Sequence, residues 1–191
     1  MRSVHKPSKA ELAAAHGTVI DDLIAPGLNV LFCGINPGLW SAATGFHFAR
    51  PGNRFWPALH QSGFTPRLFA ASEQKLLLGL GLGITNVVAR ATARADELTP
   101  SEFVTGGKRL VSVVQEYRPN FLAVVGVGAY RTAFGAPKAV VGLQEAMIGD
   151  TRVWVLPNPS GLNAHWQLPA LAAEFGRLRE AATPSRPPRR P

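Results

Sequence analysis

Short apolar runs alternate with segments of helical periodicity along most of this chain. Four runs of large and β-branched apolar residues predict buried strands, at residues 28–33, 83–88, 121–125 and 152–156. Apolar residues at helical spacing predict helices over residues 10–24, 53–62, 72–80, 108–118, a short stretch ending near 134, and 166–182. Because strands that alternate with helices favour a parallel sheet covered on both faces, the pattern predicts an α/β fold. We expect a three-layer α/β/α sandwich around a central, mainly parallel four-stranded sheet.

The sequence also predicts where some helices begin and how the chain is divided into a domain and two ends. Thr99, followed by Pro100 and Glu102, is typical of a helix start, and residues 135–151 are expected to be mostly loop with at most a minor edge strand. In the helix that begins at Ser72, three leucines are expected to be buried: Leu76, Leu77 and Leu80. The predicted organisation is a flexible N-terminal end over 1–9, a single domain over 10–182 and a disordered Pro/Arg-rich tail over 183–191.

A Gly/Pro-rich turn follows the first predicted strand and carries the most informative polar side chain. The segment Cys33-Gly34-Ile35-Asn36-Pro37-Gly38-Leu39 breaks the strand abruptly, and open α/β sheets place their ligand sites at such turns. Asn36 offers one carbonyl acceptor and two amide donors, and it has no proton to give up near neutral pH. It can therefore orient a water molecule, but it is a poor base. The alternative interpretation is a turn residue that bonds its own backbone.

A second turn of the same kind follows the last predicted strand: Leu156-Pro157-Asn158-Pro159-Ser160-Gly161-Leu162. Because both turns come directly after the carboxyl ends of strands, we expect them to share one edge of the sheet and to meet across a cleft. Aromatic residues and an arginine follow the first turn, in Thr44-Gly45-Phe46-His47-Phe48 and Asn53-Arg54-Phe55-Trp56.

In these segments the sequence resembles the mismatch-specific uracil-DNA glycosylases, which include the thymine-DNA glycosylases. The resemblance rests on residues 34–38, 44–46, 48 and 53–56, and on a second motif at 156–162 in the expected order. It covers roughly residues 20–182. It implies a uracil-DNA glycosylase-like fold and an enzyme that flips uracil out of duplex DNA and hydrolyses its N-glycosidic bond.

The resemblance also implies roles for individual residues. Asn36 would position the water, Phe48 would stack on the flipped base, and backbone N–H groups around Ile35 and Gly38 would bond the base carbonyls. Asn158 stands where more active members of the wider superfamily carry a histidine, and a neutral amide there predicts slow chemistry. Contacts with DNA are implied for four further residues: Ser41, Ser160, Gly161 and Leu162. Ser160 would contact a phosphate, and Leu162 would insert as a wedge into the base stack.

Three positions leave alternatives open. Asp96 could add the basicity that Asn36 lacks, but a helix-start or surface charge is the favoured interpretation. His47 stands where the best-known bacterial relatives have proline, and an exposed loop histidine is favoured over a contact with the base or a phosphate. The segment 163–165 lacks the arginine that some relatives carry after the wedge leucine, so we expect a weaker or different grip on the opposite guanine.

Composition narrows the classes of function. The chain has 191 residues, of which 46% are hydrophobic and 17% charged, as in globular proteins. The single cysteine, Cys33, is expected to be a buried strand-end thiol, and it excludes an internal disulfide or a multi-cysteine metal site. The histidines show no metal-ligand spacing, so no metal or other cofactor is expected. No run is long enough to span a membrane and no signal peptide is recognisable, which fits a cytoplasmic protein, nucleoid-associated if bacterial.

Charge favours a nucleic-acid partner. The formal net charge is +8, and residues 28–165 alone carry 12 Lys and Arg against 7 Asp and Glu. The charge fits the DNA partner that the resemblance implies. From the resemblance we predict a monomeric glycosylase that removes uracil, and related lesions such as ethenocytosine or thymine, from G-mismatched double-stranded DNA in base excision repair. No lysine stands at position 36 to form a Schiff base, so we expect no strand cleavage. The alternatives are a damage-sensing DNA-binding module with negligible catalysis and a nucleotide-binding α/β protein, although neither turn matches GxGxxG or a P-loop.

Overall fold

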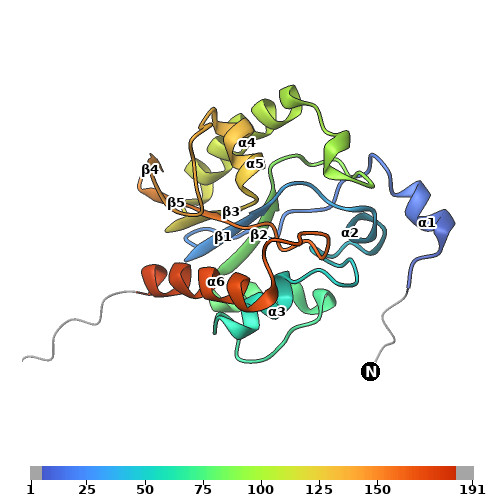
Figure 1. The fold of residues 1–191 in the computed structure, drawn as a ribbon, viewed down its shortest axis with the longest axis horizontal. Coiled ribbons are helices and arrows are strands. Elements are labelled where there is room, and N and C mark those ends of the chain that lie inside the picture. The colour runs from blue at the N-terminus through green and yellow to red at the C-terminus, as the bar shows by residue number, and fades with distance from the viewer. Residues whose placement is uncertain (1–5, 184–191) are drawn as a thin grey trace, which may run out of the picture.

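A five-stranded sheet forms the middle layer of the computed structural model, which describes residues 6–183. Figure 1 shows that the sheet is twisted. The strands lie in the order β2-β1-β3-β5-β4. Four of them run parallel: β1 (Val30–Gly34), β2 (Leu82–Asn86), β3 (Phe121–Val125) and β5 (Thr151–Leu156). The fifth, β4 (Gly142–Ile148), pairs antiparallel with β5 at one edge. The predicted α/β sandwich with a mainly parallel sheet is therefore confirmed, with one more strand than expected.

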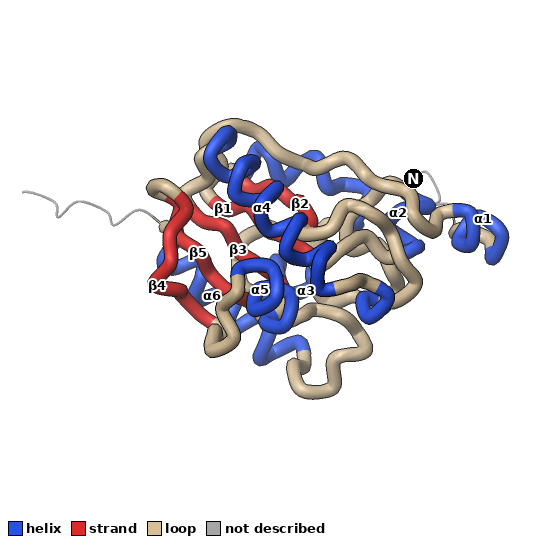
Figure 2. The backbone as a smooth tube through the Cα atoms, turned by 90° about the horizontal axis from the view of Figure 1, so that it is seen from above, coloured by secondary structure: helices blue, strands red, loops and turns tan. Residues whose placement is uncertain are grey.

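Helices cover both faces of the sheet. On one face lie α3 (Phe55–Gln61) and α6 (Leu168–Ala182), and on the other α4 (Pro100–Tyr117) and α5 (Val127–Phe134), which Figure 2 shows in front of the strands. The other elements are α1 (Lys9–Ala14), α2 (Leu39–Thr44) and the 3₁₀ segments η1 (Ala71–Leu80) and η2 (Ala95–Glu97). No helix within residues 6–183 is long and apolar enough to cross a membrane.

Strand β1 explains why the core has two halves. All five of its residues are buried, as expected for a central strand of a parallel sheet. Because successive side chains point to opposite faces, Phe32 packs toward α3 and α6, whereas Leu31 and Cys33 pack toward α4. The strand is thereby fixed from both sides, and so is the turn that follows it.

The first predicted helix is wrong over most of its length. The helix α1 ends at Ala14, and Gly17 then adopts a left-handed φ of 76°. From there to Leu23 the chain runs extended beside residues 84–91 and bonds their backbone at both ends, with Gly17 N donating to Ala91 O at 2.8 Å and Leu23 N donating to Ile84 O at 2.8 Å. We call residues 17–23 the strap. Backbone pairing with a distant segment here overrides a helical apolar spacing.

Two other helical predictions also need correction. The start at Thr99 is confirmed as a capping box with Glu102, but one continuous helix runs from there instead of beginning near 108. Residues 71–80 form a 3₁₀ segment, in which Leu77 is fully buried while Leu76 and Leu80 are 48% and 41% exposed. The tighter 3₁₀ pitch changes which side chains share a face.

The two chain ends fall largely outside the structural description. Residues 1–5 of the predicted N-terminal end and 184–191 of the predicted tail lie beyond the described residues. Residues 6–9, also assigned to that end, include Pro7, which is buried, and Ser8, which caps α1. The extents predicted for the flexible end and the tail stay predictions.

Candidate active site

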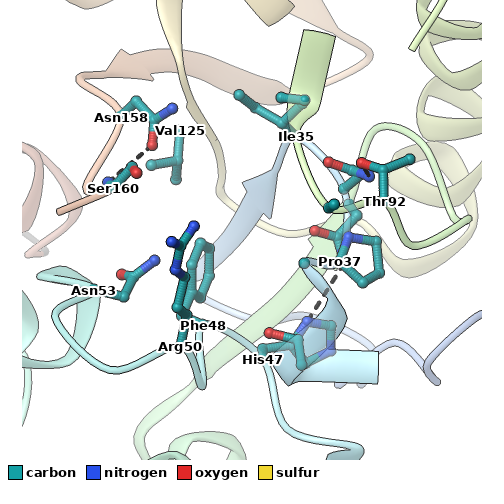
Figure 3. A pocket seen from close by; sticks show the side chains of 16 residues that line it. Ile35, Pro37, His47, Phe48, Arg50, Asn53, Thr92, Val125, Asn158 and Ser160 are labelled. Carbon is teal, nitrogen blue, oxygen red and sulfur yellow. Dashed lines mark hydrogen bonds between the residues drawn. The ribbon is translucent and has the colours of Figure 1, made fainter. Parts of the chain in front are cut away.

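The two Gly/Pro turns meet at the carboxyl edge of the parallel strands, around one pocket (Figure 3). Most of the residues singled out from sequence line it: Ile35, Asn36, Gly38, Ser41, Phe48, Asn158 and Ser160. Gly161 and Leu162 line an adjoining groove. Asp96 lines neither hollow. The structure therefore brings together nearly all of the predicted site, from Ile35 to Leu162, which lie 127 positions apart along the sequence.

The Asn36 amide is held in one orientation by hydrogen bonds. Its Nδ2 donates to the backbone oxygen of Arg90 at 3.0 Å and to Thr92 Oγ1 at 2.8 Å. Thr92 Oγ1 in turn donates its own proton to Arg94 O, so it can only accept from Asn36. Both amide hydrogens are thus used, and within residues 6–183 no donor bonds Oδ1. Asn36 therefore presents a hydrogen-bond acceptor to the pocket.

The Asn158 amide is fixed the opposite way round. Its Oδ1 accepts a hydrogen bond from Ser160 N at 3.0 Å, which forms a tight turn at the end of β5 (Figure 3). Its Nδ2 has no acceptor among residues 6–183. Asn158 therefore presents hydrogen-bond donors to the pocket, opposite the acceptor of Asn36.

An aromatic floor is supplied by Phe48. Its ring stacks on Phe55, with centroids 3.9 Å apart and planes 17° from parallel, and Phe55 is fully buried on α3. A φ of 53° sets Phe48 in the left-handed region, which is unusual for a residue other than glycine. Gly34 makes room for it, because a Cβ at position 34 would lie 3.2 Å from the ring and 2.6 Å from Asn86 Oδ1. One face of Phe48 is therefore supported and the other borders the pocket.

His47 is buried, which contradicts the prediction of an exposed loop histidine. Only 2% of the residue is exposed; its Nε2 donates to Asp21 O at 3.0 Å, and Asn86 Nδ2 lies 3.4 Å from its Nδ1. Burial lowers its pKa, while the Asp21 carbonyl and the Asp22 carboxylate oppose the shift. A neutral ring with its proton on Nε2 accepts from Asn86 at Nδ1. The loop position misled the sequence interpretation, since the strap that covers His47 lies 26 residues upstream.

Because the His47 pKa is lowered on folding, acid should destabilise the protein before its carboxylates titrate. Below the ordinary value of 6.5 the unfolded chain binds a proton that the folded chain refuses, so the free energy of unfolding falls as pH falls. We expect urea melts to show this loss between about pH 6.5 and 5, and a smaller loss in His47→Gln. Equal pH dependence of the two proteins would contradict the assignment.

Asn86 is a site residue that the sequence interpretation missed. It ends β2, lines the pocket and is 6% exposed. Since its Nδ2 is directed to His47, its Oδ1 is left without a hydrogen-bond partner among the described residues. It adds a second acceptor to the pocket. The signal was its position, because a polar residue at the carboxyl end of a buried parallel strand is a site candidate.

Ser41 and Arg54 position the loops around the pocket. Ser41 is 4% exposed, and its Oγ accepts from Ala49 N at 3.3 Å, next to Phe48. Arg54 donates to the carbonyl oxygens of Trp166, of Gly161 at 2.9 Å and of Asn163 at 3.0 Å. Its guanidinium thus holds the loop that carries Leu162, whose side chain is free to project because the residue is 76% exposed.

The two motifs also touch through their backbones. Arg54 N donates to Pro159 O at 2.9 Å. Gly161 approaches Gly52 so closely that a Cβ at position 161 would lie 2.6 Å from Gly52 O. A glycine is therefore required at 161 for the loop to seat against residues 50–54. The positioning role of Arg54 was not predicted, although the arginine was noted beside the site.

Charge in the pocket is sparse. Among the described residues that line it there is no carboxylate, and Arg50 is the one side chain with a formal charge. Asp96 points elsewhere: its side chain is 62% exposed and pairs with Arg94 at 2.6 Å. Cys33 is buried, as predicted, and burial raises its pKa, so it stays a thiol. No cluster of three or more His, Cys, Asp or Glu within residues 6–183 could hold a metal.

One comparison with known families bears on this arrangement. The sequence model described as "Uracil DNA glycosylase superfamily" matches residues 22–181, which is most of the chain and includes both turns. The matched segment also contains every residue described above as lining the pocket. The chain therefore belongs to the uracil DNA glycosylase superfamily, whose activity is the removal of uracil from DNA.

Proposed function

We propose that this protein is a monofunctional, mismatch-specific uracil-DNA glycosylase of base excision repair. It hydrolyses the N-glycosidic bond of a uracil that has been flipped out of a G-mismatched duplex. The observation that carries the proposal is the opposed pair of amides: in one pocket Asn36 presents an acceptor and Asn158 presents donors. Hydrolysis needs these two functions, because a water must be oriented on one side of the sugar and a departing anion stabilised on the other.

Each group has a distinct role in the proposed reaction. The flipped base lies against Phe48, and Asn36 Oδ1 accepts a hydrogen bond from a water aimed at C1′ of the deoxyribose. As the C1′–N1 bond breaks, its electron pair leaves with the base, and Asn158 Nδ2 donates to the carbonyl oxygen on which negative charge develops. The water oxygen bonds C1′, and its proton is lost to solvent or to the base.

Asn86 supports binding of uracil in preference to cytosine. Its free Oδ1 is an acceptor, and uracil and thymine carry an N3–H donor, whereas N3 of cytosine is itself an acceptor. The orientation of this amide depends on neutral His47, which accepts from Nδ2. The buried pair therefore supports selection of a base that carries a proton at N3.

The absence of a carboxylate among the described lining residues supports two further points. No group in the pocket can take the water proton as efficiently as an Asp or Glu, so chemistry should be slow and fastest on bases that leave readily. The same feature favours the second candidate function, a damage-sensing DNA-binding module with negligible catalysis. No lysine is among the described residues that line the pocket, which supports simple hydrolysis without strand cleavage.

Single-turnover assays with enzyme in excess separate the two candidates. Duplexes with uracil opposite guanine, uracil opposite adenine, and thymine or ethenocytosine opposite guanine should be compared with single-stranded uracil DNA. We expect base release from the uracil–guanine duplex above all, with the strand left intact until alkali is added. Tight binding to a duplex with an abasic analogue, without release of any base, would favour the binding module.

Asp96 gives a test of whether a carboxylate assists this site. Because its side chain is exposed and paired with Arg94 outside the pocket, we expect Asp96→Asn to keep its single-turnover rate within about two-fold. A loss of about 10²-fold, with unchanged melting temperature and DNA affinity, would instead assign Asp96 to water activation. The rate of the wild type should likewise be compared at neutral and acid pH.

A further inference from the structure

Three polar residues form a ridge between the base pocket and the groove beside Leu162. Arg50, Asn53 and Ser160 line both hollows. In Figure 3 the Arg50 side chain extends past Phe48 toward the side of the pocket where Asn158 and Ser160 lie, and Asn53 stands beside it. We call these three residues the ridge.

Every ridge residue presents donors that no residue within 6–183 accepts. Asn53 Oδ1 accepts from Phe55 N at 2.9 Å, which leaves the two hydrogens of Nδ2 free. Ser160 Oγ accepts from Leu162 N at 3.3 Å, which leaves its O–H free. No acceptor within residues 6–183 bonds the Arg50 guanidinium, whereas neighbouring Arg54 donates to three carbonyl oxygens.

The surroundings of the ridge favour an anion. No described residue that lines either hollow has a carboxylate, so nothing there neutralises Arg50. Free N–H and O–H donors around one guanidinium match the acceptor oxygens of a phosphate, which arginine can bind in bidentate fashion.

We propose that the ridge, with Arg50 as its charged member, is a clamp for the phosphodiester of the extruded nucleotide. This inference rests on the proposed function. A nucleotide with its base in the pocket, and with Leu162 in the gap it has left, must pass its sugar-phosphate across the boundary between the two hollows. The ridge occupies that boundary. Arg50 thus binds the flipped state and its abasic product and does not touch the departing base.

The test removes the charge from each partner separately. Binding is measured for duplexes with a tetrahydrofuran abasic analogue, in which each phosphate next to the lesion is replaced in turn by a neutral methylphosphonate. We expect Arg50→Ala to weaken binding to the unmodified lesion duplex about ten-fold or more. At one of these phosphates, the methylphosphonate should weaken binding by the wild type about as much as Arg50→Ala does. The same replacement should hardly change binding by Arg50→Ala. Lys138→Ala, which removes one positive charge from an exposed residue that lines neither hollow, is the matched control and should retain sensitivity to that methylphosphonate.

Two further measurements make the outcome decisive. Arg50→Lys, which keeps the charge but loses bidentate geometry, should fall between wild type and Arg50→Ala. At saturating enzyme, Arg50→Ala should change release of uracil and of 5-fluorouracil by the same factor, because a phosphate contact is indifferent to the leaving group. If the methylphosphonate effects of wild type and Arg50→Ala are equal at every position, or if uracil release suffers more than 5-fluorouracil release, the clamp is wrong. Binding to the abasic analogue needs no catalysis. If the wild type released no base, the proposed function would be wrong, but the binding comparison would still test the clamp.

Discussion

Asn36→Ala is expected to lose at least about 10²-fold in the single-turnover rate of uracil release, with DNA affinity kept within several-fold. The reason is geometric: Asn36 Oδ1 is an acceptor in the pocket that no described residue bonds, and both hydrogens of its amide are donated to Arg90 O and Thr92 Oγ1. Removing the side chain leaves the water without an orienting partner but takes away no cation that binds the DNA backbone. Rates on a uracil–guanine duplex and binding to an abasic analogue should be measured at one salt concentration.

Thr92→Val is the matched variant for this prediction. It keeps Asn36 but removes the acceptor that fixes the amide, so the side chain can turn its Nδ2 toward the pocket. We expect a rate between those of wild type and Asn36→Ala. A near wild-type rate in Asn36→Ala would remove this residue from the mechanism, whatever Thr92→Val does.

Asn158→Asp is expected to cost about 10³-fold in the same rate, more than Asn158→Ala. An aspartate can still accept from Ser160 N, so the turn should keep its shape. It replaces the two donors of Nδ2 with an anion that faces the negative charge growing on the departing base. The loss should be smaller for 5-fluorouracil, which leaves more readily, and smaller at low pH, where a protonated carboxyl regains an O–H donor.

The control for Asn158→Asp is a comparison of stability and binding. Melting temperature and affinity for the abasic-analogue duplex should stay close to wild type, since neither depends on the leaving base. If Asn158→Asp and Asn158→Ala lose the same factor on both bases, the amide only shapes the loop and does not stabilise the anion.

The sequence predicted the two turns well because each is a local signal. A buried apolar strand that stops at Gly and Pro needs no distant partner to be recognised, and the carboxyl edge of a parallel sheet then brings 33–39 and 156–162 together. Cys33 was predicted in the core on the same ground, and it is fully buried. The two turns at the carboxyl ends of predicted parallel strands were therefore enough to locate the pocket.

What the sequence did not predict depends on contacts between remote segments. His47 is covered by residue 21, Asn86 is oriented by His47, and Arg54 bonds carbonyl groups more than 100 residues downstream. No local periodicity carries such information. The edge strand β4 was expected only as a minor strand in a segment that is mostly loop. With one neighbour and a largely exposed face, it lacks the apolar run of a buried strand.

The strap supports residues 90–92, which hold the Asn36 amide, and it lies partly outside the region that the superfamily model matches. Residues 17 and 18 exchange backbone hydrogen bonds with Ala91, between the two positions that hold the Asn36 amide, yet the superfamily match begins only at residue 22. A fragment limited to residues 22–181 would keep every residue with a proposed chemical role but would lose residues 17–21 of the strap. In engineering terms, the smallest unit worth expressing starts at α1, because the border of the family match does not include all the residues that support the pocket.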